Sequence, residues 1–186
     1  MDFTRKACWV LDGHKTSDPI TSNYAGVVSC ESVRIALTYA VLNDIDVTCA
    51  DIQDSYLQAP LSHKHYIICE PEFGLDNLGK RAIIWRALYG GKSAGRDFRN
   101  HLRACMNHLG FKSCPSDPDV LMRPAIKAGG TNIWEYSLLY TDDILLVSCN
   151  GEDVLHDEIG KYFVLKESSI GPPKIYLGGH MRKVTL

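Results

Sequence analysis

Tyr140-Thr141-Asp142-Asp143 stands between two apolar runs, Tyr136-Ser137-Leu138-Leu139 before it and Ile144-Leu145-Leu146-Val147 after it. Two apolar runs around a short polar step predict a β-hairpin with the two carboxylates at its tip. Neighbouring carboxylates repel each other unless a cation or another partner neutralises them. Because Mg²⁺ prefers oxygen ligands, the stretch indicates a metal site. The alternative is a turn in which the aspartates make ordinary side-chain hydrogen bonds.

A third carboxylate upstream favours the metal site. Asp46-Val47-Thr48-Cys49-Ala50-Asp51-Ile52 is a β-branched run that predicts a strand, with Val47, Cys49 and Asp51 on one face. Phosphoryl transfer by two metal ions about 3.5–4 Å apart needs oxygen ligands from several elements. A strand-end aspartate and a hairpin-tip pair would supply them.

Four segments together resemble the reverse transcriptase of copia-type LTR retrotransposons, and they occur in that family's order. They are Asp51-Ile52-Gln53-Asp54-Ser55-Tyr56-Leu57, Ala87-Leu88-Tyr89-Gly90-Gly91-Lys92, Tyr140-Thr141-Asp142-Asp143 and Tyr176-Leu177-Gly178-Gly179. The resemblance runs from about Asp2 to Arg182. It implies an RNA-directed DNA polymerase region of a Gag-Pol polyprotein, whose partners are an RNA or DNA template-primer and deoxynucleotides.

The resemblance also implies roles for the acidic residues. Asp51 and Asp142 would be the principal ligands of two Mg²⁺ ions, with Mn²⁺ as a substitute, Asp143 would assist, and the Ile52 carbonyl would complete one shell. Lys166 matches a family lysine that protonates the departing pyrophosphate; the alternative is a solvated lysine.

A second group of residues is expected at the incoming nucleotide. Tyr56 falls where reverse transcriptases place an aromatic ring under the sugar, and such a ring would exclude a 2′-hydroxyl. The alternative for Tyr56 is a core aromatic. The resemblance assigns the same region to Arg5, Lys6, Tyr89 and Lys92.

The primer and template are expected at two further places. The segment from Lys174 to His180 resembles the primer grip, and a helix from about Ala94 to Leu109 is predicted to carry an arginine face opposite an apolar stripe. That face is either solvated surface or a track for phosphates. The residues assigned to primer or template are Tyr140, Arg96, Arg99, Arg103, Tyr176, Leu177 and Gly178.

Three positions depart from the family pattern. Cys8 stands where the family usually carries an arginine that contacts the triphosphate, and a thiol cannot neutralise that charge. Ser93 and Gly95 replace the usual Gln and Pro after the lysine. With these departures, the chain could be either a subfamily variant or a decaying copy of the family's sequence.

Composition sets further limits. The net charge is −2 and the pI is near 6.4, so binding of nucleic acid by bulk positive charge is not expected. Seven cysteines without a Cys-x-x-Cys pair indicate free thiols in a reducing, intracellular compartment, cytoplasmic or nuclear. His101, Cys105, His108 and Cys114 are one candidate set of zinc ligands, but their spacing matches no common structural zinc pattern. The alternative is that they are small apolar and surface positions of an amphipathic helix. Neither a secretory signal nor a membrane-spanning run is expected.

The expected fold class is α+β: an antiparallel palm sheet backed by helices, with a partial fingers subdomain, as in a right-hand polymerase without a thumb. The approximate division is fingers 1–45 and 61–88, and palm 46–60 and 89–186. Predicted elements include a helix over 31–42, capped by Ser29 and with Val33, Leu37, Ala40 and Val41 as its buried face. The helix from about Ala94 to Leu109 is expected to end at Gly110 in a left-handed stop. A later helix is expected to carry Val154, Leu155, Ile159 and Phe163, and a last strand to cover 174–184.

Two other functions stay open from the sequence. One is a decayed or domesticated fragment that binds nucleic acid without polymerising, because a chain without a thumb would hold a duplex poorly. The other is a different palm-like two-metal enzyme such as a cyclase, against which Tyr56 and the segment ending in Lys92 argue.

Overall fold

The computed structural model describes residues 9–19 and 22–184. The chain divides into two compact units, Met1–Ala25 with Asp54–His101 and Gly26–Gln53 with Leu102–Leu186. Arg5 and Lys6, which the resemblance assigned to the nucleotide, and Cys8, which departs from the family pattern, lie outside the described residues. The expected division into fingers and palm stays a prediction.

A five-stranded antiparallel sheet forms the centre of the second unit, in the order β1-β7-β6-β5-β4. Its strands are β1 (Val47–Asp51), β4 (Lys112–Ser113), β5 (Val120–Ile126), β6 (Asn132–Tyr140) and β7 (Asp143–Val147). Ile144 through Val147 are all buried, because β7 lies between two other strands and is covered by helices. The apolar runs of the sequence thus form the middle of this sheet.

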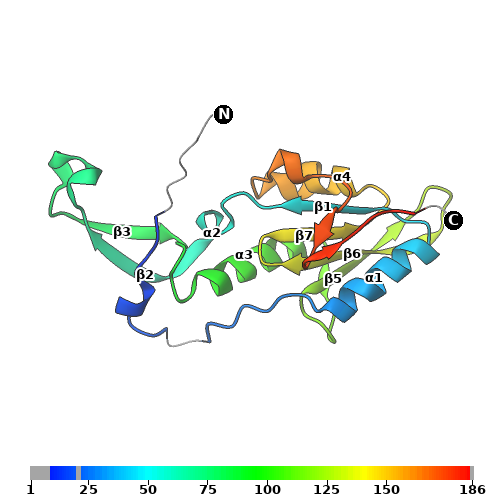
Figure 1. Ribbon diagram of the computed structural model, residues 1–186, viewed down its shortest axis with the longest axis horizontal. Helices are drawn as coiled ribbons and strands as arrows, with labels where there is room; N and C mark the ends of the chain where they lie inside the picture. The colour runs from blue at the N-terminus through cyan, green and yellow to red at the C-terminus, as the bar shows by residue number, and fades with distance from the viewer. Residues whose placement is uncertain (1–8, 20–21, 185–186) are drawn as a thin grey trace. The chain divides into compact units, whose positions relative to one another are not determined.

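Helix α1 (Cys30–Leu42) packs on this sheet, as Figure 1 shows. Ser29 caps it, since its hydroxyl accepts a hydrogen bond from the Ser32 N–H, as predicted. Its buried side chains are Val33, Ala36 and Ala40. The prediction that Val41 is buried is wrong: Val41 is 80% exposed, because the spacing of the buried stripe turns it outward.

Helix α3 (Ala94–His108) follows the predicted bounds closely. The chain leaves it through Gly110, whose φ of 88° is the left-handed stop that the sequence predicts. The next predicted helix is broken into three pieces: α4 (Gly151–Asp153), the π-helical η4 (Val154–Glu158) and the 3₁₀ turn η5 (Ile159–Lys161). Its four apolar residues are nevertheless buried, as expected.

The carboxyl-terminal segment differs from the prediction of one long strand. It forms a small hairpin of β8 (Ile175–Tyr176) and β9 (Gly179–His180). The 3₁₀ turn η6 (Glu167–Ser169) precedes this hairpin. Leu177 and Gly178 have φ values of 50° and 73°, so the backbone reverses there. Two successive positive φ angles are typical of a two-residue hairpin turn.

The first unit contains an antiparallel ribbon of β2 (Pro60–Ile68) and β3 (Arg81–Arg86), seen in Figure 1. Two 3₁₀ turns, η2 (Pro71–Phe73) and η3 (Leu75–Asn77), connect these strands. The short helix α2 (Ser55–Gln58) and the 3₁₀ turn η1 (Gly13–Lys15) complete the unit with the start of α3. The chain is therefore a mixed α/β protein with antiparallel sheets. Among the described residues, no helix has the length and apolar character needed to cross a membrane.

Candidate active site

Asp51 and Asp143 lie directly opposite each other in the pairing of β1 with β7. Asp143 also pairs with Tyr140 across the β6–β7 hairpin, whose two-residue turn is Thr141-Asp142. The Ile52 N–H donates to the Asp142 carbonyl at 2.9 Å, which ties the tip of this hairpin to the end of β1. The sheet therefore brings three aspartates from distant sequence positions to one place.

The electrostatics of this place are unfavourable for the folded chain alone. Like charges directly opposite each other in a sheet destabilise the pair. Burial, followed by the negative charges of Asp142 and Asp51, raises the pKa of Asp143 to about 6, although Lys166 opposes the rise. The site thus concentrates negative charge that one nearby lysine does not cancel.

Lys166 reaches the site from the segment that runs along the outer edge of β1. Its backbone N–H donates to the Asp51 carbonyl at 2.9 Å, and its Nζ lies 4.0 Å from an Asp51 carboxylate oxygen. Ser169 supports this arrangement, because its hydroxyl accepts from the Asp51 N–H and donates to the Lys166 carbonyl. An exposed ion pair at this distance contributes little to stability, so the lysine can turn to another anion.

The donor set fits a hard divalent cation. Carboxylate oxygens and a backbone carbonyl are the ligands that Mg²⁺ takes in proteins, and unbalanced negative charge is the condition it would relieve. Within the described part of the chain, no three or more His, Cys, Asp or Glu side chains are already gathered as a metal-ligand set. The pairing of β1 with β7 and of β7 with β6 is what brings the backbones of the three aspartates together.

Tyr176 anchors the β8–β9 hairpin beside the aspartates. Its side chain is buried, its hydroxyl donates to the Leu138 carbonyl at 3.1 Å, and its ring meets that of Tyr140 at 6.5 Å. Burial raises the pKa of Tyr176, and the negative charge of Asp143 raises it further. The hairpin that carries Leu177 and Gly178 is therefore fixed next to the acidic site.

Cys49 belongs to this site although the sequence assigned it no role. It lies two residues before Asp51 on the same face of β1, and burial followed by the charge of Asp143 raises the pKa of its thiol. Its Sγ donates to the Ser169 carbonyl at 3.6 Å. The two-residue spacing from Asp51 was the signal that could have identified it.

The residues expected at the nucleotide lie in the first unit. The ring of Tyr56 packs against those of Tyr89 at 4.8 Å and Phe98 at 5.9 Å, and it is only partly buried. A Cβ atom added at Gly95 would lie 3.7 Å from the Tyr56 hydroxyl. Tyr56 is thus held by other aromatic rings, and a Cβ atom at position 95 would make only ordinary van der Waals contact with its hydroxyl.

Lys92 is engaged within the chain. Its Nζ donates to the Thr16 carbonyl and to the Asp18 carboxylate, each at 2.8 Å. It lines an open pocket of about 220 Å³ together with His63 and His65. Nucleotide contact by Lys92 would require the exposed Asp18 to release it.

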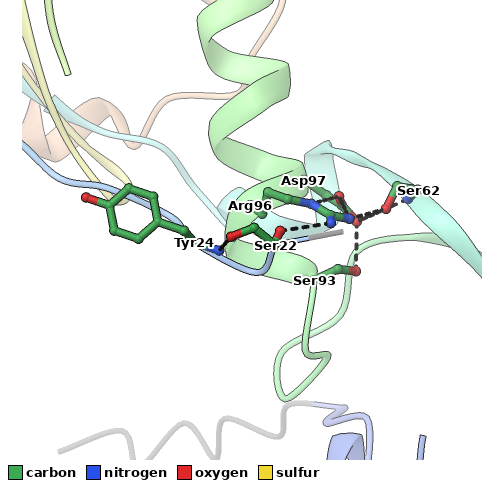
Figure 2. A network of polar contacts seen from close by, with 6 residues as sticks. All are labelled: Ser22, Tyr24, Ser62, Ser93, Arg96 and Asp97. Atoms are coloured by element: carbon green, nitrogen blue, oxygen red, sulfur yellow. Dashed lines mark hydrogen bonds and ion pairs between the residues drawn. The ribbon is translucent and has the colours of Figure 1, made fainter. Parts of the chain in front are cut away.

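Arg96 sits in a polar network, part of which Figure 2 shows. It donates to Asp97, to the Ser22 carbonyl and to the Ser62 hydroxyl, and its side chain is 11% exposed. Asp97 also accepts from the hydroxyl of Ser93, the residue that departs from the family pattern. The serine at position 93 therefore contributes a hydrogen bond that helps to hold Asp97 at the start of α3.

The other two arginines of α3 also contact neighbours. The Arg99 guanidinium lies 6.0 Å from the centre of the Tyr24 ring, and Arg103 donates to the Ser113 hydroxyl at 2.7 Å. The three arginines therefore do not form one free face, and template contact by them stays a prediction.

Comparison with known proteins shows the family to which this chain belongs. Residues 2–185 match the family described as "Reverse transcriptase (RNA-dependent DNA polymerase)". The chain belongs to this family, whose members generally use divalent metal ions.

Its similar proteins include Pol polyproteins of copia-type retrotransposons, which confirms the resemblance seen in the sequence. It is 29% identical over 163 residues to "Retrovirus-related Pol polyprotein from transposon TNT 1-94" of Nicotiana tabacum, covering 83% of this chain and 11% of that protein. It is 28% identical over 148 residues to the corresponding protein from transposon RE1 of Arabidopsis thaliana, covering 77% and 10%. The chain thus spans about a tenth of the length of these curated relatives.

Proposed function

We propose that this chain forms the palm and part of the fingers of an RNA-directed DNA polymerase from a copia-type retrotransposon. The observation that carries the proposal is the register of β1 and β7, which sets Asp51 against Asp143 beside the Asp142 turn. The raised pKa of Asp143 supports it, because the arrangement costs stability and is explained by a cationic ligand.

The aspartates would hold the metal ions. Asp51, Asp142 and the Ile52 carbonyl are the proposed ligands, with Asp143 assisting. Bound Mg²⁺ would supply activation of the primer 3′-hydroxyl and neutralisation of the triphosphate charge. The chain's own contribution is to fix its carboxylates on a rigid sheet before substrate arrives.

Lys166 would act as the proton donor to the leaving group. It faces Asp51 at 4.0 Å, and an ammonium group held near the ligands is placed to neutralise and protonate an anion leaving that site. The β8–β9 hairpin would support the primer end, because Tyr176 fixes it to the sheet beside the aspartates.

Primer extension tests the proposal. An RNA template, a DNA primer, deoxynucleotides and Mg²⁺ are incubated with the 186-residue chain and with Asp142→Asn. The matched control is Asp157→Asn, an exposed aspartate elsewhere in the same unit. We expect incorporation by the wild type and the control, and a loss on the order of a hundredfold or more in Asp142→Asn.

Undiminished incorporation by Asp142→Asn would contradict the proposal. Retention of the template-primer without incorporation by the wild type would instead support a fragment that binds nucleic acid and does not polymerise.

A further inference from the structure

The β2–β3 ribbon presents one face of large apolar side chains to solvent. Tyr66 pairs with Ile83 and Ile68 pairs with Arg81, and residues directly opposite in an antiparallel pair share a face. Trp85 follows Ile83 by two positions and therefore lies on the same face. Trp85 is 76% exposed, Tyr66 58% and Ile68 67%. We call this set the ribbon face.

Positive charge is interspersed with these side chains. Lys64 and Arg81 are exposed at positions of the ribbon face, and the sequences of β2 and β3 contain no acidic residue. The connection between the two strands carries negative charge instead, since Glu70, Glu72 and Asp76 are all exposed there. Cationic side chains thus lie on the strands and at Lys80, where the connection joins β3, and the tip of the hairpin is acidic.

Exposed aromatic side chains of this size indicate an interaction surface. Aromatic platforms between cationic side chains are what unpaired nucleic acid requires, because every base can stack on a ring and every phosphate needs a positive partner. An apolar protein surface would gain nothing from Lys64 and Arg81, whose charges it would have to desolvate. Charge and aromatic content together favour a polyanion with planar groups.

We propose that the ribbon face binds single-stranded nucleic acid, with Trp85 and Tyr66 stacking on bases and Lys64 and Arg81 contacting phosphates. The inference deepens the proposed function and rests on it for the identity of the strand, which would be unpaired template. Binding itself needs neither metal ions nor polymerisation, so it can be measured separately from activity.

Fluorescence anisotropy with a labelled single-stranded RNA of about 12 nucleotides tests the proposal on the full chain. We expect Trp85→Ala and Tyr66→Ala each to weaken binding about tenfold, and Trp85→Phe to retain most of it. Leu75→Ala is the matched control, because Leu75 is equally exposed in the same hairpin but lies in its acidic connection. All four variants should keep the wild-type melting temperature, since the substituted side chains are largely outside the core.

Salt dependence tests the cationic half of the proposal. Arg81→Ala should lower the slope of log affinity against log salt by about 0.7, the value for one phosphate contact on a single strand. An unchanged slope would overturn the assignment of Arg81.

Three outcomes would overturn the proposal as a whole. Wild-type affinity in both Trp85→Ala and Tyr66→Ala would do so, as would equal losses for the single strand and for a blunt duplex. A third is sedimentation showing that Trp85→Ala disrupts self-association while RNA affinity is unchanged, which would make the ribbon face a protein contact. None of these bears on incorporation by Asp142→Asn, so the proposed function stands or falls separately.

Discussion

Asp51 and Asp143 face each other across β1 and β7, and the charge of Asp51 helps to raise the pKa of Asp143 above its ordinary value. Burial contributes most to that rise, and Asp142 contributes next. A sheet that sets carboxylates opposite each other is less stable than one with neutral residues there. The arrangement is therefore explained by function and not by folding.

Asp143→Asn should stabilise the chain when divalent cations are absent. Removing one of the facing charges relieves repulsion, and the expected gain is about 0.2–1 kcal/mol in the free energy of unfolding. Urea denaturation in the presence of a chelator measures it. In an Asp51→Asn background the gain should shrink, because the opposing charge is already gone. A lower urea midpoint for Asp143→Asn would contradict this explanation.

The identity of the site could be predicted only in part from the sequence. The apolar runs around Asp142 and Asp143 predict a hairpin because their composition and the polar step between them are local features. That Asp51 pairs with Asp143 is a matter of register between distant strands, which no local pattern specifies. The resemblance to a family supplied that connection.

Other differences have similar causes. The breaking of the last strand into a hairpin depends on positive φ angles at Leu177 and Gly178, and Leu at such a position gives no signal. Arg96 donates hydrogen bonds to Ser22 and Ser62, which are remote from it in sequence. The helical pattern could therefore predict on which side of α3 Arg96 lies, but not which residues it would bond. Patterns along an element predict burial better than they predict polar partners.

Tyr56→Ala should relax sugar selection. The resemblance places this ring under the incoming sugar, and Tyr89 and Phe98 hold it in place. Loss of the ring would remove a steric barrier, so incorporation of ribonucleotides relative to deoxynucleotides should rise on the order of tenfold or more. Tyr24→Ala is a suitable control, since Tyr24 is an exposed tyrosine of the same unit. Unchanged sugar selection in Tyr56→Ala would contradict the assignment of Tyr56 as the ring under the incoming sugar.

Asp97 should make stability fall at acid pH. Burial alone would raise its pKa, but hydrogen bonds from the Ser62 N–H, Arg96 and the Ser62 and Ser93 hydroxyls hold the pKa below the ordinary value of 3.8. Stability from this carboxylate is therefore complete above the ordinary pKa and is lost as the pH falls through the lower pKa of the folded chain.

Urea midpoints measured across this acid range give the test for Asp97. The wild type should lose more stability than Asp97→Asn as the pH falls below about 4. At neutral pH, Asp97→Asn should already be less stable by about 1–3 kcal/mol, because buried donors lose a charged acceptor. Parallel pH profiles for the two proteins would show that the network of Figure 2 does not depend on the charge of Asp97.

Binding of Mn²⁺, followed by electron paramagnetic resonance, tests most directly whether the three aspartates form one cation site. The wild type and the Asp157→Asn control should bind the ion equally. Asp51→Asn and Asp142→Asn should each weaken binding on the order of tenfold or more, since each removes a ligand. Wild-type affinity in both variants would contradict the central claim that residues 51, 142 and 143 act together on a divalent metal.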